Sequence, residues 1–394
     1  MRLSYFLQGE DFVKIGITCY PTYGGSGVVA TELGKALASR GHQIHFISYS
    51  LPARLDNFVG DVFYHEVEMS QYPLFDFPLY TDSLASKMVD VAKYHDLEIL
   101  HVHYAIPHAT SAFIAKQILA PTKNIKVITT LHGTDVTLVG LEPSFLPLVK
   151  FSIEQSDYIT SVSKFLQMKT NTMYNIDKEI QVIPNFVDTE KFQRRKDCQF
   201  KSRIAPDGEK VLVHVSNFRA VKRVPDVIRI FDIVRKTIPS KLVLVGDGPD
   251  RSESERLARE LGIFEDVRFL GKQILLPEIL SASDLMLMPS QSESFGLSAL
   301  EAMSCSVPVV SSSTGGLPEL IVHGETGYIA ELGDVQRMAK YAIELLSDER
   351  RWELFSQNSR KRAVEKFNVN MIVPLYEKLY EEALSEIRTP ASVK

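Results

Sequence analysis

The sequence predicts an α/β protein made of two doubly wound domains whose parallel sheets face each other across a cleft. Short β-rich runs alternate with helical patterns almost throughout, which is typical of parallel sheets. The chain has 394 residues, too many for one ordinary core, and about 150 residues per domain gives two or three domains. A polar, charged stretch at residues 185–208 separates two series of strands. Ligands of such a protein bind at the carboxyl ends of the strands.

The elements follow in order from local composition. Short runs rich in β-branched and aromatic residues predict strands. In the first series they lie at 13–19, 43–48, 62–66, 99–103, 126–131, 158–162 and 180–183. Amphipathic patterns predict helices at 28–40, 81–94, 108–117 and 145–155. The second series, with helices between its strands, lies at 211–216, 241–246, 267–269, 285–288, 307–311 and 327–330, and residues 348–387 are strongly helical.

These patterns predict the domain boundaries. We expect a leader over residues 1–12, an N-terminal domain over 13–190, a linker over 191–209 and a C-terminal domain over 210–365. Residues 366–394 are expected to form a C-terminal helix that packs back on the N-terminal domain.

The amino-acid composition limits the classes of protein to which the chain can belong. A hydrophobic content of 45% and a charged content of 24% are those of a globular protein, and the net charge of −5 gives no reason to expect nucleic acid or membrane as a partner. No apolar run approaches the ~20 residues that span a bilayer. Cys19, Cys198 and Cys305 are odd in number and far apart, which favours a reducing cytoplasm over a disulfide framework. Residues 1–12 make a poor signal peptide.

The first candidate motif is the glycine loop that follows the first strand. Gly24, Gly25 and Gly27 permit a close backbone approach to a ligand, and the following helix offers its N-terminus to an anion. Residues 25–30 also fit the dinucleotide fingerprint, but no acidic residue closes the second strand to bind a ribose. A tight strand–helix turn without a ligand is the alternative.

Histidines mark the ends of two further strands. His132 follows the strand at 126–131, where an α/β sheet presents groups to a ligand, and His101, His103 and His108 surround the end of the strand at 99–103. Several histidines close together in sequence suggest a metal site, but no nearby carboxylate or cysteine completes one. We therefore expect no metal here, and a hydrogen-bonded structural histidine is the alternative reading of His132.

Charged residues gather at strand ends in the second half. Arg219 and Lys222 follow the strand at 211–216 and suit a diphosphate, although a solvated basic turn is the alternative. The strand at 285–288 leads into a loop with Glu293, and a helix starting near Phe295 carries Glu301 roughly 9 Å further along its axis. Free N–H groups at that helix start favour an anion between the two carboxylates. This spacing suggests an extended ligand such as a sugar nucleotide.

Together these motifs resemble the retaining GT-B glycosyltransferases of family four, from about residue 13 to at least residue 368. Glu293 and Glu301, with seven residues between them inside the stretch 292–302, match the glutamate pair of that family. Residues 16–21, 101–108 and 129–136 resemble the branch that transfers N-acetylglucosamine from UDP-N-acetylglucosamine to L-malate, the first step of bacillithiol biosynthesis. The resemblance implies that donor and acceptor, a cytoplasmic homodimer, and neither cofactor nor metal.

The resemblance also implies roles for individual residues. Glu301 would hold the ribose and His132 the donor sugar near the reacting carbon. Arg219 and Lys222, with Asn217 beside them, would neutralise the diphosphate. The donor sugar and phosphates would be held by Glu293 and the backbone N–H groups of Phe295, Gly296 and Leu297, and the backbone of Gly25 would approach the phosphate. The uracil would meet the backbone at Arg268 and Leu270. Hydroxyl and cationic groups for the malate would be those of Ser26, Arg54, Tyr104, Thr130 and Lys150.

The mechanism implied is metal-free, because the chain has no Asp-x-Asp pair and the cations would stabilise the leaving diphosphate instead. Three alternatives remain at this point. One is a family-four transferase with another acceptor, such as an inositol phosphate or a lipid-linked sugar. The others are an NAD-dependent oxidoreductase, supported only by residues 25–30, and a non-catalytic nucleotide-sugar binder.

Overall fold

The computed structural model describes residues 12–55, 60–69, 79–137, 142–195 and 199–388. Most of the predicted leader, and Cys198, lie outside these residues. The chain forms two compact units, Met1–Pro184 with Ile372–Lys394 (the N-terminal unit) and Asn185–Met371 (the C-terminal unit). Among the helices described, none is long and apolar enough to cross a membrane.

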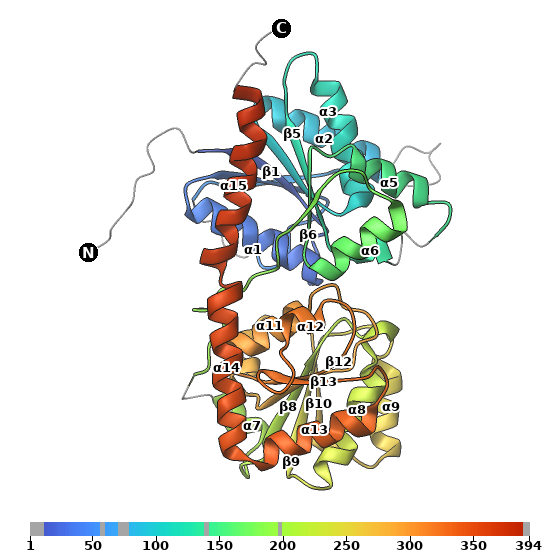
Figure 1. Cartoon of the computed structure of the whole chain (residues 1–394), viewed down its shortest axis with the longest axis vertical. Helices are drawn as coiled ribbons and strands as arrows, with labels where there is room; N and C mark the ends of the chain where they lie inside the picture. The colour runs from blue at the N-terminus through green and yellow to red at the C-terminus, as the bar shows by residue number, and fades with distance from the viewer. Residues whose placement is uncertain (1–11, 56–59, 70–78, 138–141, 196–198, 389–394) are drawn as a thin grey trace, which may run out of the picture. The chain divides into compact units, whose positions relative to one another are not determined.

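The N-terminal unit is built on a seven-stranded parallel sheet with the order β3-β2-β1-β4-β5-β6-β7 (Figure 1). The strand order reverses between β1 and β4, and in open α/β sheets ligands bind at the carboxyl ends beside such a reversal. The strands are β1 (Lys14–Thr18), β2 (Gln43–Ser48), β3 (Val62–Glu66), β4 (Ile99–His103), β5 (Lys126–Leu131), β6 (Tyr158–Ser161) and β7 (Ile180–Val182).

Helices cover both faces of this sheet, because alternate residues of each buried strand point to opposite faces. Gly34 of α1 lies against Phe46, whereas Ile47 packs on the other face with α2 and α3. From Ile372 onward α15 belongs to this unit. The helices are α1 (Gly25–Ser39), α2 (Tyr80–Tyr94), η1 (Ala105–Ala109), α3 (Thr110–Leu119), α4 (Thr134–Thr137), α5 (Leu146–Glu154), α6 (Lys164–Tyr174) and α15 (Val369–Arg388).

The C-terminal unit has a six-stranded parallel sheet with the order β10-β9-β8-β11-β12-β13, which reverses between β8 and β11. Its core packs α8, α9 and α13 on this sheet (Figure 1). The strands are β8 (Lys210–Val215), β9 (Ser240–Val245), β10 (Val267–Gly271), β11 (Leu285–Met288), β12 (Val309–Ser312) and β13 (Gly327–Ala330). The helices are α7 (Gln199–Ile204), η3 (Ala220–Lys222), α8 (Val224–Arg235), α9 (Arg251–Glu260), η4 (Phe264–Asp266), α10 (Leu276–Ala282), α11 (Leu297–Ser304), α12 (Leu317–Leu320), α13 (Val335–Ser347) and α14 (Glu349–Phe367).

The predicted fold class is confirmed, but some local features differ from the sequence patterns. Helix α6 was not predicted, because it buries only Leu166, Thr170 and Tyr174 and has little apolar periodicity. Helix α11 begins at Leu297 instead of Phe295, because Gly296 before it has a φ of +96°. Among the described residues of the stretch expected as a linker, 199–204 form α7, and Lys201 Nζ of this helix lies 2.8 Å from Asp284 Oδ1.

Candidate active site

A close ion pair at the strand ends of the C-terminal unit joins Lys222 and Glu293. Lys222 ends η3 after β8, and Glu293 lies in the loop after β11, the neighbouring strand across the order reversal. Lys222 Nζ is 2.6 Å from Glu293 Oε1, and their side chains are only 19% and 13% exposed. A backbone hydrogen bond from Gln291 N to Val221 O, 2.7 Å long, ties the two loops together. The sheet thus brings together two charges that stand 71 residues apart in sequence.

A second glycine turn fixes the backbone of Glu293. Gly316 N donates to Glu293 O over 2.9 Å. Gly315 has a φ of +62°, and a Cβ there would lie 1.8 Å from Glu293 O. A side chain at Gly315 would therefore push the loop away, so glycine is required. These contacts fix the position of the Glu293 backbone beside the second glycine turn.

The start of α11 carries the backbone N–H groups predicted for an anion. Gly296 precedes the helix in a left-handed conformation, Leu297 is its first residue, and both follow the loop of Glu293. Phe295 is buried and meets Phe367 edge-to-face, with ring centroids 5.6 Å apart. Glu301, one turn into the helix, is only 4% exposed. The carboxylate of Glu301 is thus held inside the unit, where its charge contributes to raising the pKa of Cys305 to about 12, after burial itself.

Asn217 and Arg219 are exposed on the loop after β8. The carbonyl of Asn217 lies against Gly248, where a Cβ would come within 2.0 Å, so the turn after β9 supports this loop. Arg268 and Leu270 lie on β10, an edge strand of the sheet. An edge strand offers backbone hydrogen-bonding groups that its own sheet does not use.

His214 is a residue that the sequence analysis missed. It is fully buried on β8, with Nδ1 2.8 Å from Leu287 O and Nε2 2.8 Å from Ser216 Oγ. Ser216 Oγ in turn accepts from Phe218 N over 3.2 Å. Burial lowers the pKa of His214 to about 4, so the ring is neutral at pH 7. His214 thus supports the loop that carries Arg219. Its signal in the sequence is a polar residue inside an apolar strand.

In the N-terminal unit the structure brings together Ser26, Tyr104 and His132 from three different elements. Ser26 Oγ lies 3.4 Å from Tyr104 OH, and the Tyr104 ring stacks on the His132 ring with centroids 5.9 Å apart. Gly25 precedes Ser26 at the exposed start of α1. Tyr104 has a φ of 111°, an unfavourable value for a residue with a side chain, and such strain clusters at functional sites.

Asp135 joins the loops that carry Tyr104 and His132. Its buried carboxylate accepts hydrogen bonds from Ala105 N at 3.0 Å and Gly133 N at 2.9 Å. Burial raises the pKa of this carboxyl, and the backbone donors oppose that shift. Asp135 therefore positions the ends of β4 and β5, a role that its place after the histidine–glycine pair did not reveal.

The remaining residues predicted to bind malate lie outside the cluster of Ser26, Tyr104 and His132. Thr130 is fully buried, and its Oγ1 lies 2.7 Å from both His101 Nε2 and Thr160 Oγ1. Lys150 Nζ donates to the carbonyls of Tyr174 and Asn175 at the end of α6, over 3.0 and 2.5 Å. Arg54 is half-buried in the loop after β2. A malate contact by these three stays a prediction, and the geometry favours it least for Thr130 and Lys150.

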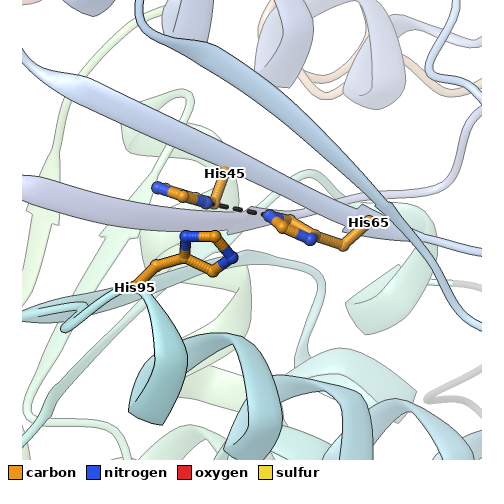
Figure 2. Close-up of side chains that lie close together, drawn as sticks. All are labelled: His45, His65 and His95. Atoms are coloured by element: carbon orange, nitrogen blue, oxygen red, sulfur yellow. Dashed lines mark hydrogen bonds between the residues drawn. The ribbon is translucent and has the colours of Figure 1, made fainter.

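Three histidines elsewhere in this unit lie close enough together to hold a metal ion. His45, His65 and His95 come from β2, β3 and the end of α2, and one ring nitrogen of each lies within 4.8 Å of the others (Figure 2). His45 Nδ1 is hydrogen-bonded to His65 Nε2 at 2.8 Å. His45 Nε2 is buried and has no partner among the described residues, so a metal on Nδ1 would leave a buried N–H unpaired. A hydrogen-bonded aromatic cluster fits this arrangement better.

Comparison with known proteins identifies the family. Residues 23–191 match the model of Glycosyltransferase Family 4, and residues 195–362 match that of Glycosyl transferases group 1. A curated relative from Bacillus anthracis, N-acetyl-alpha-D-glucosaminyl L-malate synthase, is 48% identical over 375 residues, which cover 95% of this chain and 98% of the relative. The chain belongs to the family-four glycosyltransferases. Family membership sets aside the oxidoreductase alternative.

Other relatives of this family-four glycosyltransferase differ in what their names say they act on. A mannosyltransferase from Mycolicibacterium smegmatis, named for phosphatidylinositol monomannoside, is 27% identical over 68% of this chain and 72% of its own. Among solved structures, Anabaena Alr3699/HepE in complex with UDP and glucose has a TM-score of 0.79 at 19% identity, covering 94% of this chain and 99% of its own. Sucrose-phosphate synthase from Thermosynechococcus elongatus has a TM-score of 0.78 at 22% identity, covering 95% and 99%. These structures support the GT-B fold.

Proposed function

We propose that this glycosyltransferase transfers N-acetylglucosamine from UDP-N-acetylglucosamine to the hydroxyl of L-malate, with retention of configuration and without a metal. The observation that carries the proposal is the 48% identity, over nearly the whole length, to a relative whose name states that activity. The product would enter bacillithiol biosynthesis. We further propose that the enzyme is a cytoplasmic homodimer.

The C-terminal unit supports the donor half of this proposal. The bond between the anomeric carbon and the diphosphate breaks, so negative charge grows on UDP and must be stabilised. Lys222, Arg219 and the N–H groups at the start of α11 would supply that stabilisation. Glu301 would accept the ribose hydroxyls, and the backbone of Arg268 and Leu270 on the edge strand would meet the uracil.

The N-terminal unit supports the sugar and acceptor half. His132, Tyr104 and Ser26 form one cluster of polar side chains, beside the exposed backbone of Gly25. Arg54 would supply a positive charge for a malate carboxylate. The malate hydroxyl oxygen would form the new bond on the face that the diphosphate leaves, and a phosphate oxygen would take the hydroxyl proton.

The decisive experiment measures UDP release from UDP-N-acetylglucosamine by the full-length protein, with and without L-malate. We expect release to depend on malate and the product to be the α-anomer by NMR. Inositol phosphate and a lipid-linked sugar serve as competing acceptors, and release that depends on one of them instead would replace malate. No release with any acceptor would favour a non-catalytic nucleotide-sugar binder.

The same assay in excess EDTA tests the metal-free mechanism. Because Lys222 and Arg219 would stabilise the leaving diphosphate, the rate should not change. A strict requirement for added Mg²⁺ or Mn²⁺ would overturn this part of the proposal and leave the choice of acceptor untouched.

A further inference from the structure

Behind His132 lies a second histidine that no step of the proposed reaction uses. His103 ends β4, is fully buried, and places its Nδ1 2.8 Å from His132 Nε2. A nitrogen–nitrogen hydrogen bond holds one proton, so one ring donates and the other accepts. The direction of this bond decides whether the other ring nitrogen of His132, Nδ1, offers a ligand a proton or a lone pair.

Both rings are neutral at pH 7. Burial lowers the pKa of His132 to about 3, and burial together with the neighbouring histidines lowers the pKa of His103 well below its ordinary value. Each ring therefore carries a single N–H, and the hydrogen bond between them has only two arrangements. Either His103 donates from Nδ1, or His132 donates from Nε2.

The surroundings of the other ring nitrogen of His103, Nε2, show which of these two arrangements is favoured. His103 Nε2 is buried and has no hydrogen-bond partner among the described residues. If His132 donated, the proton of His103 would sit on Nε2 as an unpaired buried N–H, which native proteins rarely contain. If His103 donates, its Nε2 holds only a lone pair. His108, whose Nδ1 lies 2.6 Å from the carbonyl oxygen of His103, keeps this strand end in place.

We propose that His103 is a positioning residue that donates its Nδ1 proton to His132 Nε2, and so holds His132 with its own proton on Nδ1. His132 then offers a hydrogen-bond donor to an oxygen of the donor substrate. It offers no base there, which agrees with proton transfer to a phosphate oxygen. The action of His132 on a sugar nucleotide rests on the proposed function, whereas the direction of the bond does not.

The direct test is the ¹⁵N chemical shifts and long-range couplings of the histidine rings in the ligand-free, full-length protein at pH 7. We expect the Nδ1–H form of His132. His103→Asn can still donate from the position of Nδ1 and should keep that form, whereas His103→Leu should allow the Nε2–H form to appear. An Nε2–H form of His132 in the unchanged protein would overturn the proposal, even if neither variant folds.

Kinetics provide the second readout. We expect His103→Leu to lower kcat/KM for transfer roughly 10- to 100-fold, as for one hydrogen bond lost in the transition state, and His103→Asn to restore most of it. UDP affinity should change in neither variant, which separates a local effect from unfolding. Equal activity of the Leu and Asn variants would contradict the positioning role. If malate-dependent transfer is absent but His132 carries its proton on Nδ1, the proposed function fails and the tautomer assignment stands.

Discussion

Replacing Lys222 with methionine gives the sharpest test of the donor half of the site. The substitution keeps an unbranched side chain and removes the charge that faces Glu293 across 2.6 Å. If Lys222 binds the diphosphate of UDP, its loss removes a charge-assisted hydrogen bond and leaves the Glu293 carboxylate to repel the ligand.

The structure bounds the size of this effect. A hydrogen bond to a charged group contributes about 1.5–3 kcal/mol, which corresponds to roughly a 10- to 140-fold weaker Kd for UDP. The repulsion from Glu293 argues for the upper part of that range. Glu293→Gln in the Lys222→Met background removes this repulsion, so the double variant should bind UDP more tightly than Lys222→Met alone.

The chain provides a matched control in the pair of Lys241 and Asp266. Lys241 Nζ lies 2.7 Å from Asp266 Oδ1, and its side chain is 19% exposed, the same as that of Lys222. Lys241 stands near the start of β9, at the opposite end of the sheet from Lys222. Lys241→Met breaks a comparable ion pair and should cost similar stability, but it should leave UDP affinity unchanged.

Isothermal titration of UDP into the two variants and the control measures UDP affinity, and thermal unfolding of each protein measures stability. The reasoning is refuted if Lys222→Met binds UDP as well as the unchanged protein, or if Lys241→Met weakens UDP binding equally. In the second case the effect on UDP would arise from the general loss of a charge.

Further predictions concern Glu301, two glycines of α1 and one buried histidine. Glu301→Gln should weaken UDP binding by ~1.5–3 kcal/mol, and an unchanged Kd would count against its ribose contact. Gly27→Ala should lower the free energy of unfolding by about 1–3 kcal/mol, because its Cβ would lie 2.3 Å from Tyr20 O. Gly25→Ala meets no atom within 4 Å, so it should fold normally and slow transfer only; normal transfer would exclude a backbone contact there. Burial lowers the pKa of His45 to about 3, so its contribution to stability is full above pH ~6.5 and falls as the pH drops. The free energy of unfolding, measured with urea, should therefore fall less between pH 7 and pH 5 in His45→Phe than in the unchanged protein. An identical fall in the two proteins would contradict this linkage.

The sequence predicted the fold, and it singled out Glu293 and Glu301 as candidate donor ligands, because these signals are local. Strand runs such as 285–288, the glycine at 296 and the spacing of Glu293 from Glu301 each lie within a dozen residues. Family resemblance added roles that residue chemistry alone would not supply. Helix α6 was missed because its buried face is too narrow to give a periodic signal.

Only the tertiary structure decided which residues that are distant in sequence contact each other. The pairing of Lys222 with Glu293, of His103 with His132, and of Asp135 with two loop ends joins residues from neighbouring parallel strands. The same packing gives Thr130 and Lys150 structural partners that their residue types did not indicate. By itself the sequence determined the order and type of most elements, because periodicity and turn chemistry act over a few residues. Contacts between side chains depend on strand order and register, which arise only when the whole sheet forms.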